Sequence, residues 1–328
     1  MKKTLSVLLL LCLFLTACAK DGPAETEIFA MDTYMRIRIW GDNDLLNDAV
    51  DEIRRLEGLF SATDEDSEIC ALNQNGTAEL STETAELLSK SIVLSERTGG
   101  AFEPTVYPLV SAWGFTSGDA HVLSQEELDT LLPLVGIEHL TLEGATATLT
   151  DGAQVDLGGI AKGYTAQKCL ELLAEKGVHT AMLSLGGNVQ TLGTKPDGSA
   201  WVIGIANPEE PSEAIATLTF TGSMAIVTSG GYQRYFDSDG TRYHHILDPE
   251  TGKPAETELA SVTILTRDGT TADALSTALF VMGMEKAADF WRESDDFEAV
   301  FILQDGNIFA TEGAASLLGG CAFTEITR

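Results

Sequence analysis

The sequence is poor in positively charged residues. Of its 328 residues, 20 are lysine or arginine and 50 are aspartate or glutamate, which gives a formal net charge of −30. Nucleic acids and anionic membrane surfaces attract proteins that carry basic patches. The composition therefore argues against electrostatic binding to either, and no nucleic acid is expected as a partner. A phosphorylated ligand would need a metal cation or a locally positive pocket.

Cysteines and the common nucleotide-binding motifs are also scarce. Cys70, Cys169 and Cys321, the cysteines beyond the N-terminal region, are too widely spaced for a disulfide framework or a zinc site. No G-x-G-x-x-G fingerprint occurs at the glycine-rich stretch 156–163. It is not a P-loop either, because Lys162 precedes Gly163 where that motif needs Gly-Lys-Ser/Thr. If this stretch binds phosphate, it does so by another arrangement.

The N-terminal region carries the signals of secretion. Lys2 and Lys3 precede an apolar run at 5–15 that is too short for a permanent membrane span, so residues 1–17 are predicted to be a signal peptide. The ending Leu15-Thr16-Ala17-Cys18 resembles a bacterial lipobox. We therefore expect Cys18 to be lipidated and to anchor the protein on the extracytoplasmic face of the bacterial cell membrane. A plain secretory signal is the alternative.

Helical and strand patterns are mixed along the rest of the chain. Apolar spacing predicts helices at 43–60, 82–98, 125–134, 160–176, 271–282 and 285–293. Strands are predicted at 28–40, in a hairpin of 141–150 with 153–156 around Asp151-Gly152, through 180–246, at 260–266 and in a hairpin at 299–310. This mixture favours an α+β fold with largely antiparallel sheets and packed helices. Residues 18–27 are expected to be a tether and 28–328 a single domain.

The stretch DLGGIAKG at 156–163 is a candidate anion site. Asp156 and two glycines precede a predicted helix, and a helix N-terminus offers free backbone N–H groups to an anion. Lys162 would add a positive charge. The alternative is purely structural: Gly158 and Gly159 allow a tight turn from strand to helix, and Lys162 is solvated.

A second candidate lies at the start of a predicted helix near residue 271. Asp273 and Thr277 are four residues apart, so they share one helical face. A carboxylate and a hydroxyl there form part of an oxygen shell suited to Mg²⁺. An aspartate in the first helical turn is also expected from capping and the helix dipole alone.

Two adjacent histidines form a third candidate. His244 and His245 precede the turn Asp248-Pro249, in a segment that reads as a strand. Successive strand residues point to opposite faces, so at most one of them faces a given pocket. A histidine there suits acid–base chemistry near neutral pH, and a surface histidine pair is the alternative.

In this order, these segments resemble the ApbE family of FAD:protein FMN transferases. The resemblance runs from about Ala30 to Met284 and also includes Met31-Asp32-Thr33, Ser67–Asn73, Gly100–Pro104, Ser184–Asn188 and HHILDPETGKP at 244–254. It implies the α+β fold of that family and a Mg²⁺-dependent reaction on FAD as substrate. In that reaction FMN becomes attached by a phosphoester bond to a threonine of an acceptor flavoprotein, and AMP is released.

The resemblance also implies roles for single residues. The residues expected to contact FAD are Met31, Asn73, Ala101, Phe102, Glu103, Asp156, Lys162, His245 and Ile246. The carbonyl of Ala161, with Asp273 and Thr277, would hold Mg²⁺. His245 stands at the position of the catalytic base. The acceptor would be a membrane redox subunit or another extracytoplasmic protein.

Two other functions would use the same site. In a Mg²⁺-dependent FAD pyrophosphatase, water replaces the threonine and the products are FMN and AMP. A flavin-binding lipoprotein without catalysis needs no base, so the presence of Asp273, Thr277 and His245 argues against it. The chain departs from the family pattern at Thr63, Glu103 and Gly231, which affects the expected FAD contacts rather than the metal site.

Overall fold

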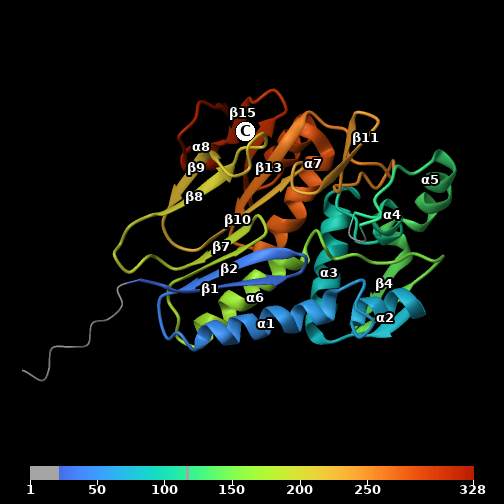
Figure 1. The fold of residues 1–328 in the computed structure, drawn as a ribbon, viewed down its shortest axis with the longest axis horizontal. Coiled ribbons are helices and arrows are strands. Elements are labelled where there is room, and N and C mark those ends of the chain that lie inside the picture. Colours follow the sequence, from blue (N-terminus) through green and yellow to red (C-terminus); the bar gives the residue numbers. More distant parts are fainter. Residues whose placement is uncertain (1–21, 116–117) are drawn as a thin grey trace, which may run out of the picture.

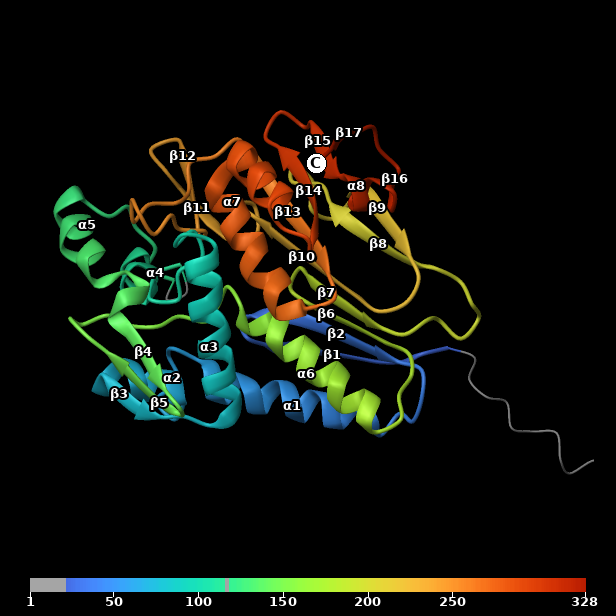
Figure 2. The same ribbon diagram turned by 180° about the vertical axis from the view of Figure 1, so that it is seen from behind.

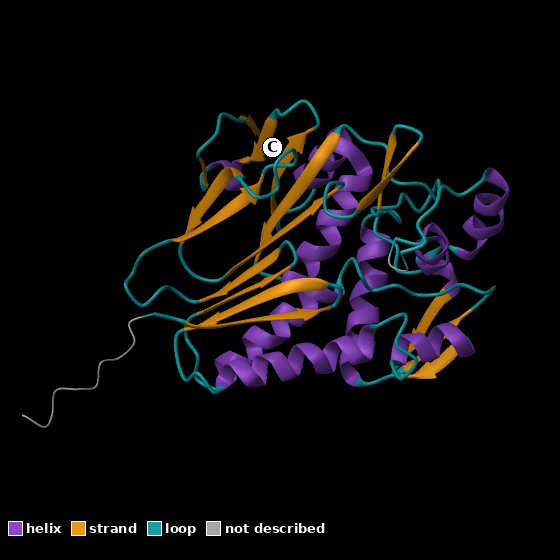
Figure 3. Ribbon diagram, viewed as in Figure 1, coloured by secondary structure: helices purple, strands orange, loops and turns teal. Residues whose placement is uncertain are grey.

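The computed structural model describes residues 22–115 and 118–328, which form the expected α+β fold (Figure 3). The predicted signal peptide and Cys18 lie outside the described residues. The helices are α1 Leu45–Phe60, α2 Glu68–Asn75, α3 Thr82–Arg97, α4 Tyr107–Trp113, α5 Gln125–Leu131, α6 Ala161–Glu175, α7 Gly269–Arg292 and α8 Glu312–Ala315. The strands before residue 200 are β1 Ala24–Ala30, β2 Thr33–Ile39, β3 Thr77–Glu79, β4 Leu140–Glu143, β5 Thr146–Leu149, β6 Ala181–Leu185 and β7 Asn188–Leu192. Those after it are β8 Trp201–Ala206, β9 Ala214–Phe220, β10 Met224–Gly230, β11 Tyr235–Ser238, β12 Thr241–His244, β13 Leu259–Thr266, β14 Glu298–Leu303, β15 Ile308–Thr311, β16 Leu318–Gly319 and β17 Thr324–Ile326.

Nine of the described strands form one sheet, in the order β1-β2-β6-β7-β10-β13-β14-β15-β17. Its neighbours pair antiparallel except for β15 and β17. Helices α1, α6 and α7 lie on one face, and the sheet formed by β8, β9 and β16 lies by the other (Figures 1 and 2). The prediction of largely antiparallel sheets with packed helices is confirmed.

Alternating side chains of the central strands supply a core on each face of this sheet. Val227, Ile264 and Phe301 belong to the core cluster that includes α7. Their chain neighbours Ile226, Leu265 and Ile302 belong to the cluster that includes β8 and β9. Both faces can be covered because most residues along these strands are apolar or small, and successive side chains point to opposite sides.

A second lobe carries α2, α4, α5 and the small sheet β3-β5-β4, and α3 connects it to α7 (Figure 1). The turn after the two histidines is fixed to this lobe, because Trp113 Nε1 donates a 2.8 Å hydrogen bond to the carbonyl of Gly252. Gly252 has a φ of 70° and a Cβ there would lie 3.0 Å from Leu128, so a side chain at this position would be both strained and crowded.

The expected single strand at 28–40 is wrong, because it is a hairpin. Met31 and Asp32 have φ values of 47° and 56° and form the turn between β1 and β2. This left-handed geometry is common at glycine or asparagine but not at methionine, so no turn could be predicted at Met31. Strand β1 begins at Ala24, so the sheet includes residues 24–27 of the expected tether.

The expected hairpin of 141–150 with 153–156 is also wrong. Strands β4 and β5 pair around Gly144-Ala145, and residues 153–156 form no strand, only one bridge between Gln154 and Val106. Asp151 and Gly152 do adopt positive φ, but their turn leads away from the small sheet toward the pocket described below. A turn signal locates a reversal without fixing which strands pair across it.

The two helices expected at 271–282 and 285–293 are present as the two segments of α7, which are separated by a kink at the non-helical Gly283. Gly283 has a φ of 76°, and the next N–H, of Met284, donates to Glu258 instead of continuing the helical ladder. Of the residues that the structure describes, none form a helix long and apolar enough to cross a membrane.

Candidate active site

A pocket of about 790 Å³ opens where the β1–β2 turn, the start of α6, the first turns of α7 and the segment after β12 meet. It brings together most of the residues singled out in the sequence. Among its lining residues are Met31, Ala101, Phe102, Glu103, Asp156, Lys162, His245, Ile246, Asp273 and Thr277. Segments separated by more than two hundred residues therefore share one cavity of a size suited to an organic cofactor or substrate.

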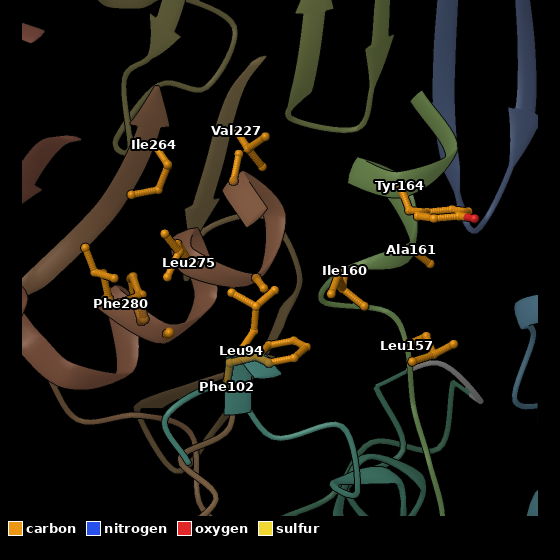
Figure 4. Close-up of a cluster of buried hydrophobic side chains, with 14 of the residues drawn as sticks. Leu94, Phe102, Leu157, Ile160, Ala161, Tyr164, Val227, Ile264, Leu275 and Phe280 are labelled. Carbon is orange, nitrogen blue, oxygen red and sulfur yellow. The ribbon is translucent and has the colours of Figure 1, made fainter. Parts of the chain in front are cut away.

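The glycine-rich stretch forms the loop that leads into α6. The Asp156 N–H donates to the carbonyl of Pro104, and its carboxylate accepts a 2.6 Å hydrogen bond from the Gly158 N–H. Leu157 and Ile160 are buried in the hydrophobic cluster beside the helix start (Figure 4). This alternation of buried apolar and half-exposed polar residues presents Gly158, Gly159 and Lys162 to the pocket.

Burial raises the pKa of the Asp156 carboxyl above its ordinary range. The Gly158 N–H and the nearby charges of Lys162 and Arg234 oppose this shift, because they favour the ionised carboxylate. A raised pKa in a pocket marks a group whose protonation responds to what binds beside it.

Asp273 is a buried carboxylate at the crossing of α6 and α7, whose N-terminal turns meet (Figure 2). Its Oδ2 accepts a 2.8 Å hydrogen bond from the Gly163 N–H. A Cβ at Gly163 would lie 2.1 Å from the carbonyl oxygen of Gly269, so only glycine lets the two helices approach this closely. Glycine is thus required at position 163, because any side chain there would prevent the close helix contact in which the Gly163 N–H reaches the Asp273 carboxylate.

Thr277 lies one turn after Asp273 and faces the same pocket. Its Oγ1 is 3.4 Å from Ser229 Oγ on β10, and Ser229 is also hydrogen-bonded to Ser276 at 2.7 Å. The backbone of Gly159 comes close as well, because a Cβ there would be 3.7 Å from Thr277 Oγ1. The structure therefore joins the first two candidate clusters into one.

The residues present at this crossing fit a divalent metal ion. Asp273 is only 4% exposed, yet none of the ion pairs within residues 22–115 and 118–328 involves it. A buried carboxylate without a cation is costly, and a metal ion with oxygen ligands would neutralise it. The described residues contain no group of three or more His, Cys, Asp or Glu side chains placed to hold a metal. The expected ligand set has a single carboxylate and relies on Thr277 and a backbone carbonyl.

His245 lies in the pocket wall, one residue beyond the end of β12. Its backbone N–H and its Nδ1 both contact the carbonyl of Arg234 at 3.1 Å. Because a carbonyl only accepts, Nδ1 carries the proton and Nε2 carries the lone pair. Burial, reinforced by the positive charge of Arg234, lowers the pKa of His245 to about 4. The imidazole is therefore neutral at physiological pH.

His244 belongs to a different cavity, of about 920 Å³, which His245 does not line. Its Nε2 is 3.2 Å from the carbonyl of Ala255, and its ring meets Phe280 edge-on. A Cβ at Gly231 would lie 2.9 Å from the His244 ring. The departure at Gly231 thus gives room to His244 and does not alter the first pocket, whose lining does not include it.

Two cations line the pocket. Lys162 Nζ donates a 2.7 Å hydrogen bond to the carbonyl of Gly158, so the side chain folds back over its own loop. Arg234 was not singled out in the sequence, and its only signal there is its place four residues after the Thr-Ser-Gly sequence that ends β10. Its guanidinium is 3.5 Å from the carbonyl of Asp32 across the pocket.

Other predicted contacts are placed differently. Asn73 does not line the pocket; it braces the loop by exchanging two hydrogen bonds, of 2.6 and 2.8 Å, with the backbone of Val155. Ala161 is buried next to Lys162 and is not among the lining residues. Glu103 lines the pocket, but its carboxylate accepts hydrogen bonds from Thr105 and from Ser95, while burial raises its pKa.

Thr63 lies outside the pocket lining, in the turn after α1. Ser229, which contacts Thr277, was not among the residues singled out in the sequence either. A serine in a strand carries no sign of which helix it will meet, so this contact could be found only from the fold.

Comparisons with known proteins agree with this geometry. The sequence profile of the ApbE family matches residues 31–301. The FAD:protein FMN transferase of Treponema pallidum is 34% identical over 306 residues, which cover 86% of this chain and 84% of the relative. The corresponding protein of Vibrio cholerae is 36% identical over 252 residues, 75% of each chain.

Solved structures give the same result. The ApbE protein of Thermotoga maritima superposes with a TM-score of 0.84 at 35% identity, covering 90% of this chain and 99% of that one. The flavin transferase ApbE of Vibrio cholerae superposes with a TM-score of 0.78 at 30% identity, over 90% and 99% of the two chains. The family profile, the relatives and the shared fold all cover the pocket, and this chain belongs to the ApbE family.

Proposed function

We propose that this protein is an FAD:protein FMN transferase. It would take FMN from FAD, attach it to a threonine of an acceptor protein and release AMP. The observation that carries the proposal is that one pocket holds a neutral histidine, two cations and a buried carboxylate without a cationic partner. These are the groups that phosphoryl transfer from a charged pyrophosphate needs.

His245 would act as the general base. Its Nε2 would accept the proton of the acceptor threonine while the threonine oxygen forms a bond to the FMN phosphorus. The bond from that phosphorus to the bridging oxygen breaks, and AMP leaves with the bond electrons. Because Nδ1 is fixed on the carbonyl of Arg234, the imidazole keeps its basic nitrogen available and does not need to change tautomer.

Asp273 and Thr277, with the carbonyl of Ala161, would hold Mg²⁺ at the crossing of α6 and α7. When bound there, the ion neutralises negative charge on the pyrophosphate. The Gly163 N–H occupies Oδ2 of Asp273, which leaves Oδ1 as the carboxylate oxygen offered to a metal. Ser229 would orient the Thr277 hydroxyl from the opposite side.

Lys162 and Arg234 would hold the phosphates and offset the acidity of the chain. With a net charge of −30, the protein attracts no anion at long range, so local cations must do so inside the pocket. Met31 at the β1–β2 turn, with Ala101, Phe102 and Ile246, would supply apolar surface for the ring systems of FAD. Asp156 would contact FAD from the loop, and Glu103, whose carboxylate is already paired, would shape the wall.

We also propose that the protein works at the extracytoplasmic face of the membrane, anchored by a lipid on Cys18. Strand β1 begins at Ala24, and the five intervening residues span at most about 18 Å when extended. The catalytic domain would then stay close to the bilayer, where a membrane-bound redox subunit can serve as the acceptor. Fractionation of a Cys18→Ala variant into the soluble fraction would support this placement, and continued membrane association would contradict it.

The decisive experiment incubates the protein with FAD, Mg²⁺ and a candidate acceptor, followed by intact-mass analysis. A transferase adds the mass of FMN to the acceptor and releases AMP. Free FMN and AMP with an unmodified acceptor would identify a pyrophosphatase instead. Bound FAD that stays intact, with every acceptor tested, would mean flavin binding without catalysis.

A further inference from the structure

A pair of buried amides lies under the candidate metal site. Gln190, on β7, is 3% exposed, and its Nε2 donates a 2.9 Å hydrogen bond to the carbonyl of Gly163. The same Nε2 donates at 3.0 Å to Oδ1 of Asn188, which is fully buried. Neither amide has a role in the chemistry described above.

The hydrogen bonds fix how both amides are oriented. A backbone carbonyl only accepts, so the Gln190 atom facing Gly163 must be the amide nitrogen. That nitrogen in turn requires an oxygen on Asn188. A Cβ at Gly269 would lie 2.0 Å from Gln190 Nε2, which shows how tightly the helix start packs on this amide. The orientation of Gln190 is therefore determined by its surroundings.

Through the Gly163 residue, Gln190 is connected to Asp273. Gln190 binds the carbonyl of Gly163, and the N–H of Gly163 binds Oδ2 of Asp273. Gly163 has no side chain to hold it in place, since the close helix crossing forbids one. Among the described hydrogen bonds, the two that reach this residue from outside its helix are those from Gln190 and to Asp273.

We propose that Gln190 is a positioning residue for the metal-binding carboxylate. By holding Gly163 it keeps the Gly163 N–H on Oδ2, so that Oδ1 of Asp273 stays turned toward the pocket. Asn188 assists by fixing the amide of Gln190. The inference rests on the metal role proposed above for Asp273, and it is distinct from that proposal because Gln190 touches neither metal nor substrate.

The chain offers a matched control at the same helix crossing. Gln167, on α6, also uses its amide on a backbone group of α7, because its Oε1 accepts a 3.0 Å hydrogen bond from the Gly269 N–H. This contact braces the same helices but does not lead to Asp273. Gln190→Met and Gln167→Met each remove one side-chain amide and keep a similar length and volume.

The test measures the affinity of each purified variant for Mn²⁺ alone, by electron paramagnetic resonance, because Mn²⁺ replaces Mg²⁺ at oxygen sites and can be observed directly. Substitution of a residue that orients a metal ligand typically weakens metal binding by about 10- to 100-fold. We expect Gln190→Met to weaken Mn²⁺ binding by about 10-fold or more and Gln167→Met to leave it unchanged. In transfer assays Gln190→Met should raise the Mg²⁺ concentration needed for half-maximal rate, with the KM for FAD little changed.

If Gln190→Met folds poorly, a second variant can be used to test the same inference. Asn188→Leu removes the acceptor that orients Gln190 and should weaken Mn²⁺ binding in the same direction, by less. Equal Mn²⁺ affinity in the wild type and in a folded Gln190 variant overturns the inference, as does an equal loss in Gln167→Met. If the wild type binds Mn²⁺ but transfers no FMN, the proposed function fails while the comparison of Mn²⁺ affinities still decides this inference.

Discussion

Two cavities lie on either side of one short segment, and adjacent histidines divide between them. The first holds His245, the cations Lys162 and Arg234, and the carboxylates of Asp32, Glu103, Asp156 and Asp273. The second holds His244, and its charged lining is one arginine with the carboxylates of Glu209, Glu256, Glu258 and Asp305. Each pocket is lined by four carboxylates, so the two differ less in net charge than in what accompanies the carboxylates: the first has two cations and His245, whereas the second has the single cation of Arg242.

The difference shows how a strand end can determine the role of a residue. Strand β12 stops at His244, whose ring packs against Phe280 and under Gly231. One residue later the chain turns into the first cavity, and the carbonyl of Arg234 sets the tautomer of His245. Burial lowers the pKa of both rings, so the direction of the pKa shift does not distinguish the two histidines. The groups that surround each ring distinguish them.

The largest effect on activity is expected from removing the carboxylate of Asp273 in the first cavity, compared with removing a carboxylate of the second. Asp273→Ala should reduce AMP release and FMN transfer to background, because the expected metal ligands would be left with a hydroxyl and a carbonyl. Glu256→Ala removes an exposed carboxylate of the second cavity and should change neither. Quantifying AMP with saturating FAD and Mg²⁺ distinguishes them, and full activity in Asp273→Ala would show that the assigned metal site is wrong.

The histidines give the next largest contrast. His245→Ala should slow transfer by about 10²–10⁴-fold, the usual contribution of a positioned general base. FAD affinity should survive, because proton removal matters only in the chemical step. His244→Ala should cost little transfer. Flavin fluorescence on the acceptor after gel electrophoresis measures both, and a dominant effect at His244 would place the base in the second cavity.

A smaller effect is expected from the cations. Lys162→Ala should weaken FAD binding several-fold at low ionic strength, and the loss should shrink in high salt, where its charge is screened. Arg242→Ala, in the second cavity, should leave FAD affinity unchanged. Titration of FAD fluorescence at two salt concentrations tests this. Unchanged affinity in Lys162→Ala at low salt would return Lys162 to a role in bracing the Gly158 carbonyl.

The smallest effect concerns pH. An ordinary histidine titrates near 6.5, which is what the sequence alone predicts, but burial lowers the pKa of His245 to about 4. The unfolded chain therefore binds a proton that the folded protein does not, and stability contributed by the neutral ring is lost as pH falls from about 6.5 to about 4.

The His245→Gln variant should consequently lose less stability than the wild type between pH 7 and pH 4.5, as measured by urea denaturation. NMR titration of the histidine ring protons in the ligand-free protein gives the pKa directly. A value near 6.5 would contradict the burial seen here and restore the ordinary titration.

Much of the fold was predictable because its signals are local. Helices α1, α3 and α6 begin and end within two residues of the predicted limits, since apolar periodicity and flanking glycines act over a few residues. The β1–β2 turn was missed because Met31 and Asp32 adopt positive φ without glycine or asparagine. The partner of β5 was missed because a turn signal does not specify pairing.

By itself the sequence determined the α+β class, the acidic character of the chain and the short motifs that carry the chemistry, since each depends on composition or on neighbouring residues. Only the tertiary structure decided that Arg234 and Ser229 enter the pocket, that Asn73 braces Val155 instead, and that Gln190 reaches Asp273 through Gly163. These contacts join segments far apart in the chain. They form because buried polar groups must find partners once the helices and the sheet have packed, and that requirement cannot be read from either partner alone.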